Sequence, residues 1–338
     1  MEKKQIVFTE INKAELLAKD VEELNSDSVR VKLAVSTISA GTEKANITGD
    51  PSVSGPNAPR VQFPRTLGYS ASGVVTETGA DVKSVKVGDR VIVSWGTHSS
   101  ISTVKEKFIT KIPYEDISFE QAAYIHIATF PMAAIRKCKL EMGESAIVMG
   151  MGILGMFAVQ LLKIGGAVPI IAVDPDESKR KKALEVGADY ALDPYASDFA
   201  ETAKKLTNGG ANVGLEITGI GAGLDGILDC MALKGRVALL GCTRNSDFTI
   251  DYYRKVHGPG ITLVGAHTAA RPSTNSSNGW WTERDDFEAV LRLTKMGRIN
   301  LAELVEETHS PNESTEIYTR LCNDKTFPLV QFDWRLLK

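Results

Sequence analysis

The stretch "VMGMGILG" constrains the fold of this 338-residue chain more than any other. It places Gly150, Gly152 and Gly155 in a G-x-G-x-x-G pattern, between the apolar run "SAIVMG" and the helical pattern "ILGMFAVQLLKIGG". A strand, a glycine turn and a helix in this order are typical of the first unit of a dinucleotide-binding sheet. Gly150 permits the tight turn, Gly152 lets the backbone approach a pyrophosphate, and Gly155 lets the helix pack close to the strand.

The residues around this turn also predict which dinucleotide binds. The backbone N–H groups of Ile153 and Leu154 lie at the start of the helix, where the dipole favours phosphate. The next strand, "PIIAVD", ends in Asp174, about 20 residues after the motif, and we expect its carboxylate to bind the adenosine ribose. The same charge repels a 2′-phosphate and favours NAD(H), although the nearby Lys179 leaves NADP(H) open. The predicted cofactor-binding set is completed by Thr218 and Gly241.

The pattern of apolar residues divides the chain into two parts. From Glu144 onward, short all-apolar strands alternate with helical patterns, which predicts a doubly wound parallel sheet covered on both faces. Residues 1–120 instead contain β-branched runs bounded by Gly, Asp and Pro, among them "VRVKLAVSTIS" and "DRVIVSWG", and predict a β-rich domain. Between them "FEQAAYIHIATFPMAAIRKC" is helical, and Pro131 predicts a kink or a division of that helix.

Composition and charge exclude several classes of protein. The chain is 43% hydrophobic and 24% charged, which is ordinary for a globular protein of about two domains. The net charge of −3 comes from interspersed residues, so no nucleic-acid partner is expected. No apolar run is long enough for a membrane helix, and "MEKKQIVFTE" lacks the apolar part of a signal peptide. Four scattered cysteines predict free thiols and a cytoplasmic location.

Taken together, these motifs resemble the medium-chain dehydrogenase/reductase superfamily of the zinc alcohol and polyol dehydrogenase type. The likeness runs nearly end to end and is carried by "SAGTE", "LGYSASGVVTETGADVKSVKVGDRV", the glycine motif, "VDPDESKRKKALEVGADYALDP" and "LEITG". The resemblance implies an α/β fold in which a Rossmann domain, residues 123–268, is inserted in a β-rich GroES-like catalytic domain made of residues 1–122 and 269–338. It also implies a homodimer or homotetramer that pairs along the strand near "ITLVGA".

The zinc ligands of that family are missing from the matching positions. The family's cysteine is Ala40 here, its His–Glu pair is Tyr69 and Ser70, and its third ligand position falls near His126. A tetrahedral zinc site needs at least three N, S or O⁻ ligands. The four closely spaced cysteines of the family's structural zinc lobe are also absent. We therefore expect no zinc at either place.

Without a metal, hydride transfer still needs a group that binds the developing oxyanion and exchanges a proton. Tyr69 stands where a ligand would stand, Thr42 matches the family's proton-relay hydroxyl, and His126 is a candidate acid/base. Each has a structural alternative: Tyr69 as a space-filling side chain, His126 as a core histidine, and Thr42 as a turn hydroxyl. The predicted substrate pocket adds Glu43, Trp95, His98 and His267.

These residues predict an NAD(H)-dependent, zinc-independent oxidoreductase that interconverts a secondary alcohol and a ketone. The amides and tryptophans of "RPSTNSSNGWW" favour a sugar or polyol as the small-molecule substrate. Three alternatives stay open at this point. They are a zinc-free quinone or enoyl reductase that uses NAD(P)H, an epimerase or lyase that recycles bound NAD, and a non-catalytic NAD(H)-binding sensor. Asp174 argues mildly against the first, because double-bond reductases usually prefer NADPH.

Overall fold

The computed structural model describes residues 1–54, 61–243, 247–324 and 326–337. The chain divides into two compact units. The first combines Met1–His126 with Leu301–Lys338, and the second is the continuous segment Ile127–Asn300. The sequence predicted an inserted domain over residues 123–268, so the difference lies mainly in residues 269–300, which belong to the inserted unit.

Residues after 268 stay with the inserted unit because they are tied to the second half of helix α2 (Phe119–Lys137). Arg271 Nη2 donates to the Thr129 carbonyl oxygen over 2.9 Å. Arg136 Nε donates to Asp286 Oδ1 over 3.0 Å, and the same guanidinium lies 3.6 Å from the Trp281 ring centroid. These contacts turn Arg271 and Trp281 of the predicted sugar-facing loop towards the protein, which leaves that prediction with less support.

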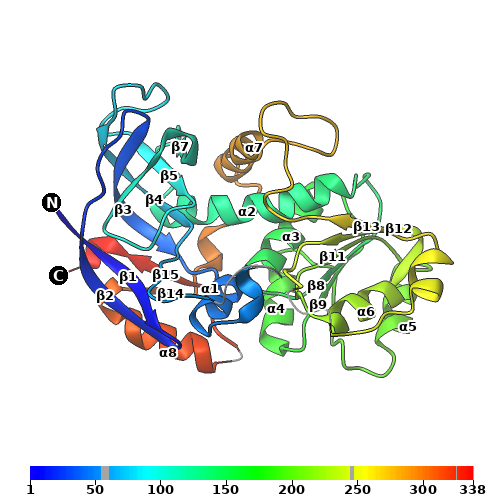
Figure 1. Cartoon of the computed structure of the whole chain (residues 1–338). Coiled ribbons are helices and arrows are strands. Elements are labelled where there is room, and N and C mark those ends of the chain that lie inside the picture. The colour runs from blue at the N-terminus through cyan, green and yellow to red at the C-terminus, as the bar shows by residue number, and fades with distance from the viewer. Residues whose placement is uncertain (55–60, 244–246, 325, 338) are drawn as a thin grey trace. The chain divides into compact units, whose positions relative to one another are not determined.

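The inserted unit is a six-stranded parallel sheet in the order β10-β9-β8-β11-β12-β13, which confirms the predicted doubly wound fold. Figure 1 shows α5 and α6 together on one side of this sheet and α3 on the other. The strands are β8 (Ala146–Met149), β9 (Ile170–Val173), β10 (Tyr190–Leu192), β11 (Ala211–Glu216), β12 (Met231–Leu239) and β13 (Thr262–Gly265); the helices are α3 (Ile153–Ile164), α4 (Glu177–Glu185), α5 (Phe199–Leu206), α6 (Gly221–Asp229) and α7 (Glu283–Lys295).

Apolar side chains on both faces of the central strands hold this sheet. Ile147 of β8 and Ile171 of β9 pack with Phe199 of α5 and Ile227 of α6. Burying each such side chain contributes about 1.5–3 kcal/mol. The chain order reverses beside β8, which has β9 on one side and β11 on the other. In open α/β sheets the crevice at the carboxyl ends of such strands is where ligands bind.

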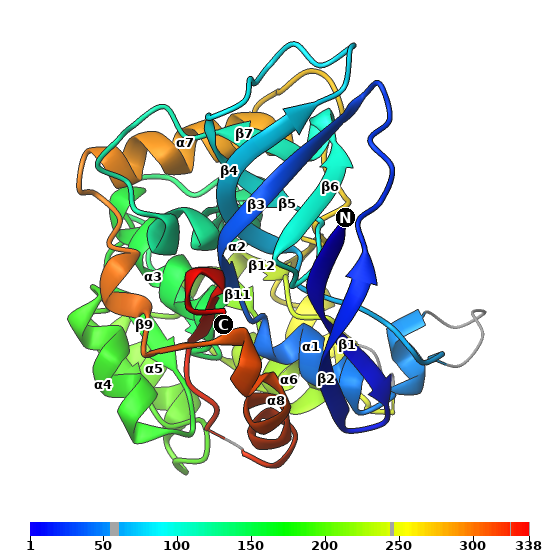
Figure 2. The ribbon, with the colours of Figure 1, turned by 90° about the vertical axis from the view of Figure 1, so that its left-hand side faces the viewer.

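The other unit is the predicted β-rich, GroES-like domain, with a seven-stranded sheet in the order β14-β15-β3-β4-β5-β7 and β6 paired to β3. Figure 2 shows the separate β1–β2 hairpin next to α8, and Thr315 Oγ1 of α8 donates to the Ala14 carbonyl oxygen of β2 over 2.8 Å. Helix α2 runs unbroken through Pro131, so the predicted division of that helix does not occur. The elements are β1 (Glu2–Glu10), β2 (Lys13–Asp20), β3 (Ser28–Thr37), α1 (Ala40–Ile47), β4 (Ser70–Thr78), β5 (Arg90–Ser94), β6 (Ile101–Lys105), β7 (Ile109–Lys111), β14 (Glu307–His309), α8 (Ser314–Asn323) and β15 (Val330–Asp333).

All four cysteines are free thiols. Burial raises the pKa of both Cys138 and Cys230 to about 12, so these two thiols stay protonated and unreactive near neutral pH. Within the described ranges, no helix combines the length and the apolar character that crossing a membrane requires.

A charged cluster joins three elements of the GroES-like unit. His309 at the end of β14 lies between two carboxylates, 2.9 Å from Glu307 Oε2 and 2.8 Å from Glu313 Oε2. Arg320 of α8 makes two further hydrogen bonds to Glu307. Burial lowers the pKa of His309, but the hydrogen bonds with the two glutamates outweigh it, so the pKa is raised above its ordinary value of 6.5.

A raised pKa predicts that this cluster stabilises the fold most in acid. The contribution is fully present below the unfolded-state pKa and is lost as pH rises through the raised folded-state value. The free energy of unfolding of His309→Gln should therefore fall below that of wild type at about pH 6, by about 0.5 kcal/mol after solvent screening, and approach it at about pH 8. Urea titrations at both values measure this difference, and a gap that widens with rising pH would contradict the prediction.

Candidate functional site

The predicted cofactor-binding residues gather at one edge of the Rossmann sheet. Gly150 follows β8, Asp174 follows β9, Thr218 follows β11 and Gly241 follows β12. Parallel strands end on the same side, so these residues line the carboxyl edge beside the reversal of strand order. The fold therefore brings these four residues, which are far apart in the sequence, to the same edge of the sheet.

The glycine turn has the geometry that a phosphate requires. Gly150 has a φ of +101°, a left-handed conformation that favours glycine. A Cβ at Gly155 would lie 2.0 Å from the Gly150 carbonyl oxygen, so α3 approaches the turn as closely as a glycine allows. A Cβ at Gly152 would meet nothing within 4 Å, and this N-cap offers no side chain to the first N–H groups of α3, including those of Ile153 and Leu154. Open space beside uncapped N–H groups fits a dinucleotide phosphate.

The carboxylate of Asp174 accepts hydrogen bonds from the backbone around the turn. Its Oδ2 accepts from the Met151 N–H over 2.8 Å, and its Oδ1 accepts from the Asp176 N–H over 2.9 Å. The residue is only 8% exposed. Each carboxylate oxygen has a second lone pair, so the group can bind a ribose hydroxyl as well as brace the turn.

Lys179 and Arg180 lie in the first turn of α4. The Lys179 N–H donates to the N-cap Asp176, and its ammonium makes no ion pair within the described part of the chain. Arg180 Nη1 donates to the carbonyl oxygens of Asp174 and Pro175 over 2.7 and 2.8 Å. The guanidinium of Arg180 therefore binds the backbone just after β9, including that of Asp174, the predicted ribose acid.

A buried acid that sequence reasoning missed holds the next turn. Glu216 ends β11 at 1% exposure, and its Oε1 accepts from the Thr218 N–H over 2.8 Å and from the Thr218 hydroxyl. Burial raises the pKa of Glu216 above its ordinary value, although these hydrogen bonds act to lower it. Its carbonyl oxygen accepts from the Gly241 N–H over 2.8 Å. The signal available in the sequence was an acid that closes an otherwise apolar strand, "VGLE".

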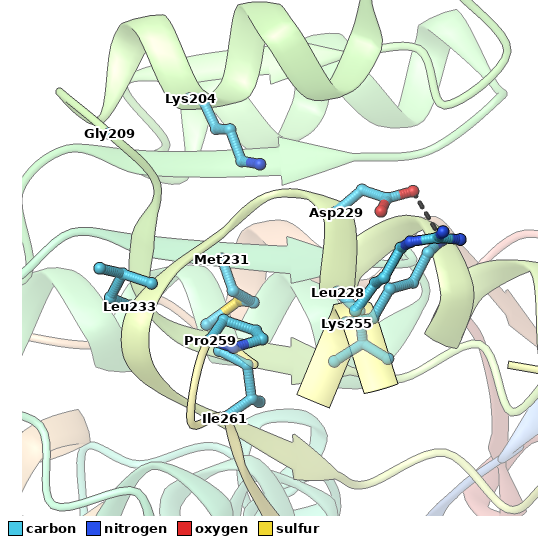
Figure 3. A pocket seen from close by; sticks show the side chains of 10 residues that line it. Lys204, Gly209, Leu228, Asp229, Met231, Leu233, Lys255, Pro259 and Ile261 are labelled. Carbon is cyan, nitrogen blue, oxygen red and sulfur yellow. Dashed lines mark hydrogen bonds and ion pairs between the residues drawn. The ribbon is translucent and has the colours of Figure 1, made fainter. Parts of the chain in front are cut away.

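The remaining features of this unit lie elsewhere. His267 is exposed on the loop after β13, and its Nδ1 accepts from the Ala269 N–H over 3.1 Å. A hollow of about 230 Å³, lined by Lys204, Met231 and Ile261 among others, is shown in Figure 3. It lies where β12 and β13 begin, whereas the glycine turn follows the end of β8. The hollow is therefore not part of the dinucleotide edge.

In the GroES-like unit, strand pairing brings two predicted residues side by side. Ser70 of β4 pairs with Ser94 of β5 in an antiparallel register, so Tyr69 and Trp95 flank the same end of this ladder. The Tyr69 carbonyl oxygen accepts from the Trp95 N–H over 2.9 Å and lies 2.8 Å from His126 Nδ1. Because a carbonyl only accepts, Nδ1 of His126 carries the proton.

Three rings meet around this carbonyl. The ring centroids of Tyr69 and Trp95 are 5.6 Å apart, those of Tyr69 and His126 are 5.5 Å apart, and those of Trp95 and His126 are 4.9 Å apart. Trp95 has a φ of +58° and is 42% exposed, a strained and solvent-facing position for a large side chain. Strain of this kind is concentrated at functional sites. His126 is fully buried, so it contacts the other two rings and presents no surface of its own.

The hydroxyl groups of this cluster have defined partners. The half-buried Tyr69 donates its hydroxyl proton to Ser39 Oγ over 2.6 Å. The Tyr69 hydroxyl is therefore bonded to another side chain. The Thr42 hydroxyl, partly exposed in the first turn of α1, makes no hydrogen bond among the described residues.

The residues at the family's metal positions do not fit zinc. Ala40 offers a methyl group, and the buried Ser70 donates its hydroxyl to the Ala123 carbonyl oxygen over 2.6 Å. Tyr69 donates to Ser39, and one nitrogen of His126 is held by a carbonyl. Across the described ranges, no group of three or more His, Cys, Asp or Glu residues is arranged to hold a metal ion. A tetrahedral zinc site needs more N, S or O⁻ ligands than this place supplies.

The structure does not expose two residues predicted to line the substrate pocket. Glu43 is 0% exposed and His98 is 1% exposed. His98 Nε2 lies 3.2 Å from Glu43 Oε2, and the Tyr318 hydroxyl donates to the same carboxylate oxygen. A buried carboxylate needs such donors to offset its lost hydration. Glu43 and His98 therefore form an internal network, and their burial gives no support to the prediction that they line the substrate pocket.

Known proteins resemble the chain in both units. Residues 25–114 match the family model described as the alcohol dehydrogenase GroES-like domain, and residues 154–293 match the one described as zinc-binding dehydrogenase. A sorbitol dehydrogenase from Halalkalibacterium halodurans is 30% identical over 293 residues, which cover 76% of this chain and 80% of that protein. The (R,R)-butanediol dehydrogenase of Bacillus subtilis is 29% identical over 270 residues, 72% of each chain.

A solved structure shares the fold. An alcohol dehydrogenase from Escherichia coli CFT073, complexed with NADH, superimposes with a TM-score of 0.82 at 18% identity, covering 98% of this chain and 99% of that one. The two matched models, one in each unit, and the sorbitol dehydrogenase relative agree with the architecture. The chain therefore belongs to the zinc-type medium-chain dehydrogenase/reductase superfamily.

Proposed function

We propose that the protein is an NAD(H)-dependent, zinc-independent oxidoreductase that interconverts a secondary alcohol and a ketone. Its substrate in this proposal is a small polyhydroxylated molecule, a sugar or polyol derivative. The single observation that carries the proposal is the Tyr69–Trp95–His126 cluster, which places a phenol and an imidazole at two of the family's metal positions and an indole beside them. The names of the relatives, sorbitol and butanediol dehydrogenases, support the substrate class.

The Rossmann unit supports the cofactor half of the proposal. Uncapped N–H groups at the start of α3 are suited to bind the pyrophosphate, and Asp174 to bind the adenosine ribose. When bound, the nicotinamide ring accepts or returns the hydride at its C4 atom. The protein then has to bind the substrate oxygen and handle its proton.

We assign those two tasks to the GroES-like unit. Tyr69 is half-buried and can present its hydroxyl to the substrate oxygen, with the partly exposed Thr42 hydroxyl as a second proton carrier. His126 holds the Tyr69 backbone from below the surface, so it orients this residue instead of touching the substrate. Trp95 supplies an exposed apolar wall.

Assembly and location remain proposals as well. We propose a homodimer or homotetramer that pairs along β13, which is the terminal strand of the Rossmann sheet. A terminal strand offers unpaired backbone groups to a second copy. The free thiols support a reducing, cytoplasmic location.

The activity test uses the purified protein with a panel of polyols and secondary alcohols plus NAD, and in parallel a panel of quinones and enones plus NADPH. We expect turnover on the first panel by protein that contains no stoichiometric zinc by elemental analysis, with no loss of rate after EDTA treatment. Stoichiometric zinc whose removal abolishes turnover would refute zinc independence. Turnover on the second panel alone identifies a double-bond reductase, and NADH binding with no turnover on either favours a sensor.

The glycine turn generates a matched pair of variants. Gly152→Ala adds a methyl group where nothing lies within 4 Å, so it should leave the thermal midpoint unchanged but weaken NADH about tenfold or more by filling the phosphate space. Gly155→Ala places its methyl 2.0 Å from the Gly150 carbonyl oxygen and should lower the thermal midpoint. NADH fluorescence titration and thermal unfolding distinguish the two effects. Unchanged NADH affinity in Gly152→Ala contradicts the assigned phosphate position.

Asp174→Asn tests the ribose assignment. Loss of the charged acceptor should weaken NADH by roughly 10- to 100-fold and reduce the preference for NADH over NADPH. Asp189→Asn is the matched control, because Asp189 also accepts a backbone N–H, that of Ile170 over 2.7 Å, but at the start of β9. We expect Asp189→Asn to bind NADH as wild type does. If cofactor preference does not move in Asp174→Asn, the assignment is incorrect.

A further inference from the structure

Ser39 occupies the N-cap of α1 but does not cap it. Serine at this position usually accepts a hydrogen bond from an N–H in the first turn of its helix. Ser39 makes no such bond, and its hydroxyl oxygen instead accepts the hydroxyl proton of Tyr69 over 2.6 Å. Ser39 is 8% exposed, so a small part of the residue reaches solvent. The Ser39 hydroxyl therefore binds Tyr69 in place of the usual capping bond to its own helix.

A buried carboxylate fixes the backbone of Ser39. The Ser39 N–H donates to Glu43 Oε1 over 2.8 Å, one turn along α1. The other oxygen of Glu43 accepts from Tyr318 and faces His98 Nε2, while His98 Nδ1 lies 2.7 Å from a serine hydroxyl of β3. Glu43 is therefore held from α8 and from the loop after β5, and Ser39 is held by Glu43. A hydroxyl mounted on so constrained a backbone can set the direction of its partner's O–H bond.

We propose that Ser39 is a positioning residue for Tyr69, and this inference rests on the proposed function. By accepting the hydrogen bond of the Tyr69 hydroxyl, Ser39 directs a lone pair of the phenol oxygen towards the hydroxyl group of an alcohol substrate. As the substrate O–H bond breaks, its proton passes to the Tyr69 oxygen, the original Tyr69 proton passes to Ser39, and a Ser39 proton passes to water. The electron pair of the substrate C–H bond leaves as hydride to nicotinamide, so the alcohol loses one hydride and one proton.

The geometry makes the substitution at Ser39 informative. Ser39→Ala removes the acceptor but no helix cap, because the hydroxyl does not bond to α1. Ser39→Thr keeps an oxygen at the same place. Neither change touches the glycine turn, which lies in the other unit of the chain. Both variants should therefore bind NADH as wild type does and serve as folding controls for each other.

Kinetics on the polyol panel give the first readout. We expect Ser39→Ala to lower kcat roughly 10- to 100-fold with little change in KM, because a misdirected catalytic group costs about that much. Ser39→Thr should restore kcat to within about threefold of wild type. In the Tyr69→Phe background, Ser39→Ala should cause no further loss. Equal losses by Ser39→Ala in both backgrounds, or an unchanged kcat in the single variant, would overturn the proposal.

A second readout does not depend on turnover. In protein labelled with ¹³C at tyrosine Cζ, the Tyr69 resonance is identified by its loss in Tyr69→Phe. It should shift in Ser39→Ala and return towards its wild-type position in Ser39→Thr. An unshifted resonance in Ser39→Ala overturns the proposal even if the enzyme is active. If wild-type protein turns over neither panel, that result counts against the proposed function alone, and the resonance still decides whether Ser39 directs the Tyr69 hydroxyl.

Discussion

The aromatic cluster of the GroES-like unit depends on one backbone carbonyl, that of Tyr69. It accepts hydrogen bonds from the Trp95 N–H over 2.9 Å and from His126 Nδ1 over 2.8 Å at the same time. The first bond extends the β4–β5 ladder by one residue past its last pair, and the second fixes helix α2 against that end. The three rings belong to the residue that owns this carbonyl and to the two residues that donate to it. Their mutual geometry therefore depends on these two hydrogen bonds.

Much of the Rossmann unit could be predicted from the sequence because its constraints are local. The three glycines follow an apolar strand or begin a helix, and the structure gives a physical reason for Gly150 and for Gly155. Asp174 was also located correctly at the end of β9, although its carboxylate binds two backbone N–H groups before any cofactor arrives. The end of the inserted unit could not be predicted. It depends on Arg271 and Trp281 packing against α2, which is a contact between distant parts of the chain.

The GroES-like unit shows what reasoning from matched positions leaves out. Motif matching placed Glu43 and His98 near a pocket, but it carries no information on burial, and the structure closes both into a network with Tyr318. Ser39 and Glu216 were missed for the opposite reason. Each looks like an ordinary cap or strand end, and only the direction of its hydrogen bonds marks it as a support for a residue that we propose to be functional.

The two-part construction of the GroES-like unit has a consequence for how the protein is made. The Rossmann segment is continuous, so it can fold as soon as it has left the ribosome. Strand β3, in contrast, pairs with β15, which is translated much later. The Gln331 side chain of β15 bonds to Thr37 of β3 across 294 positions of sequence. Until β15 is translated, the C-terminal end of β3 has one unpaired edge on the nascent chain, and such edges can pair with strands of other chains. Aggregation should therefore be most frequent in chains whose synthesis stops between the two halves of this sheet.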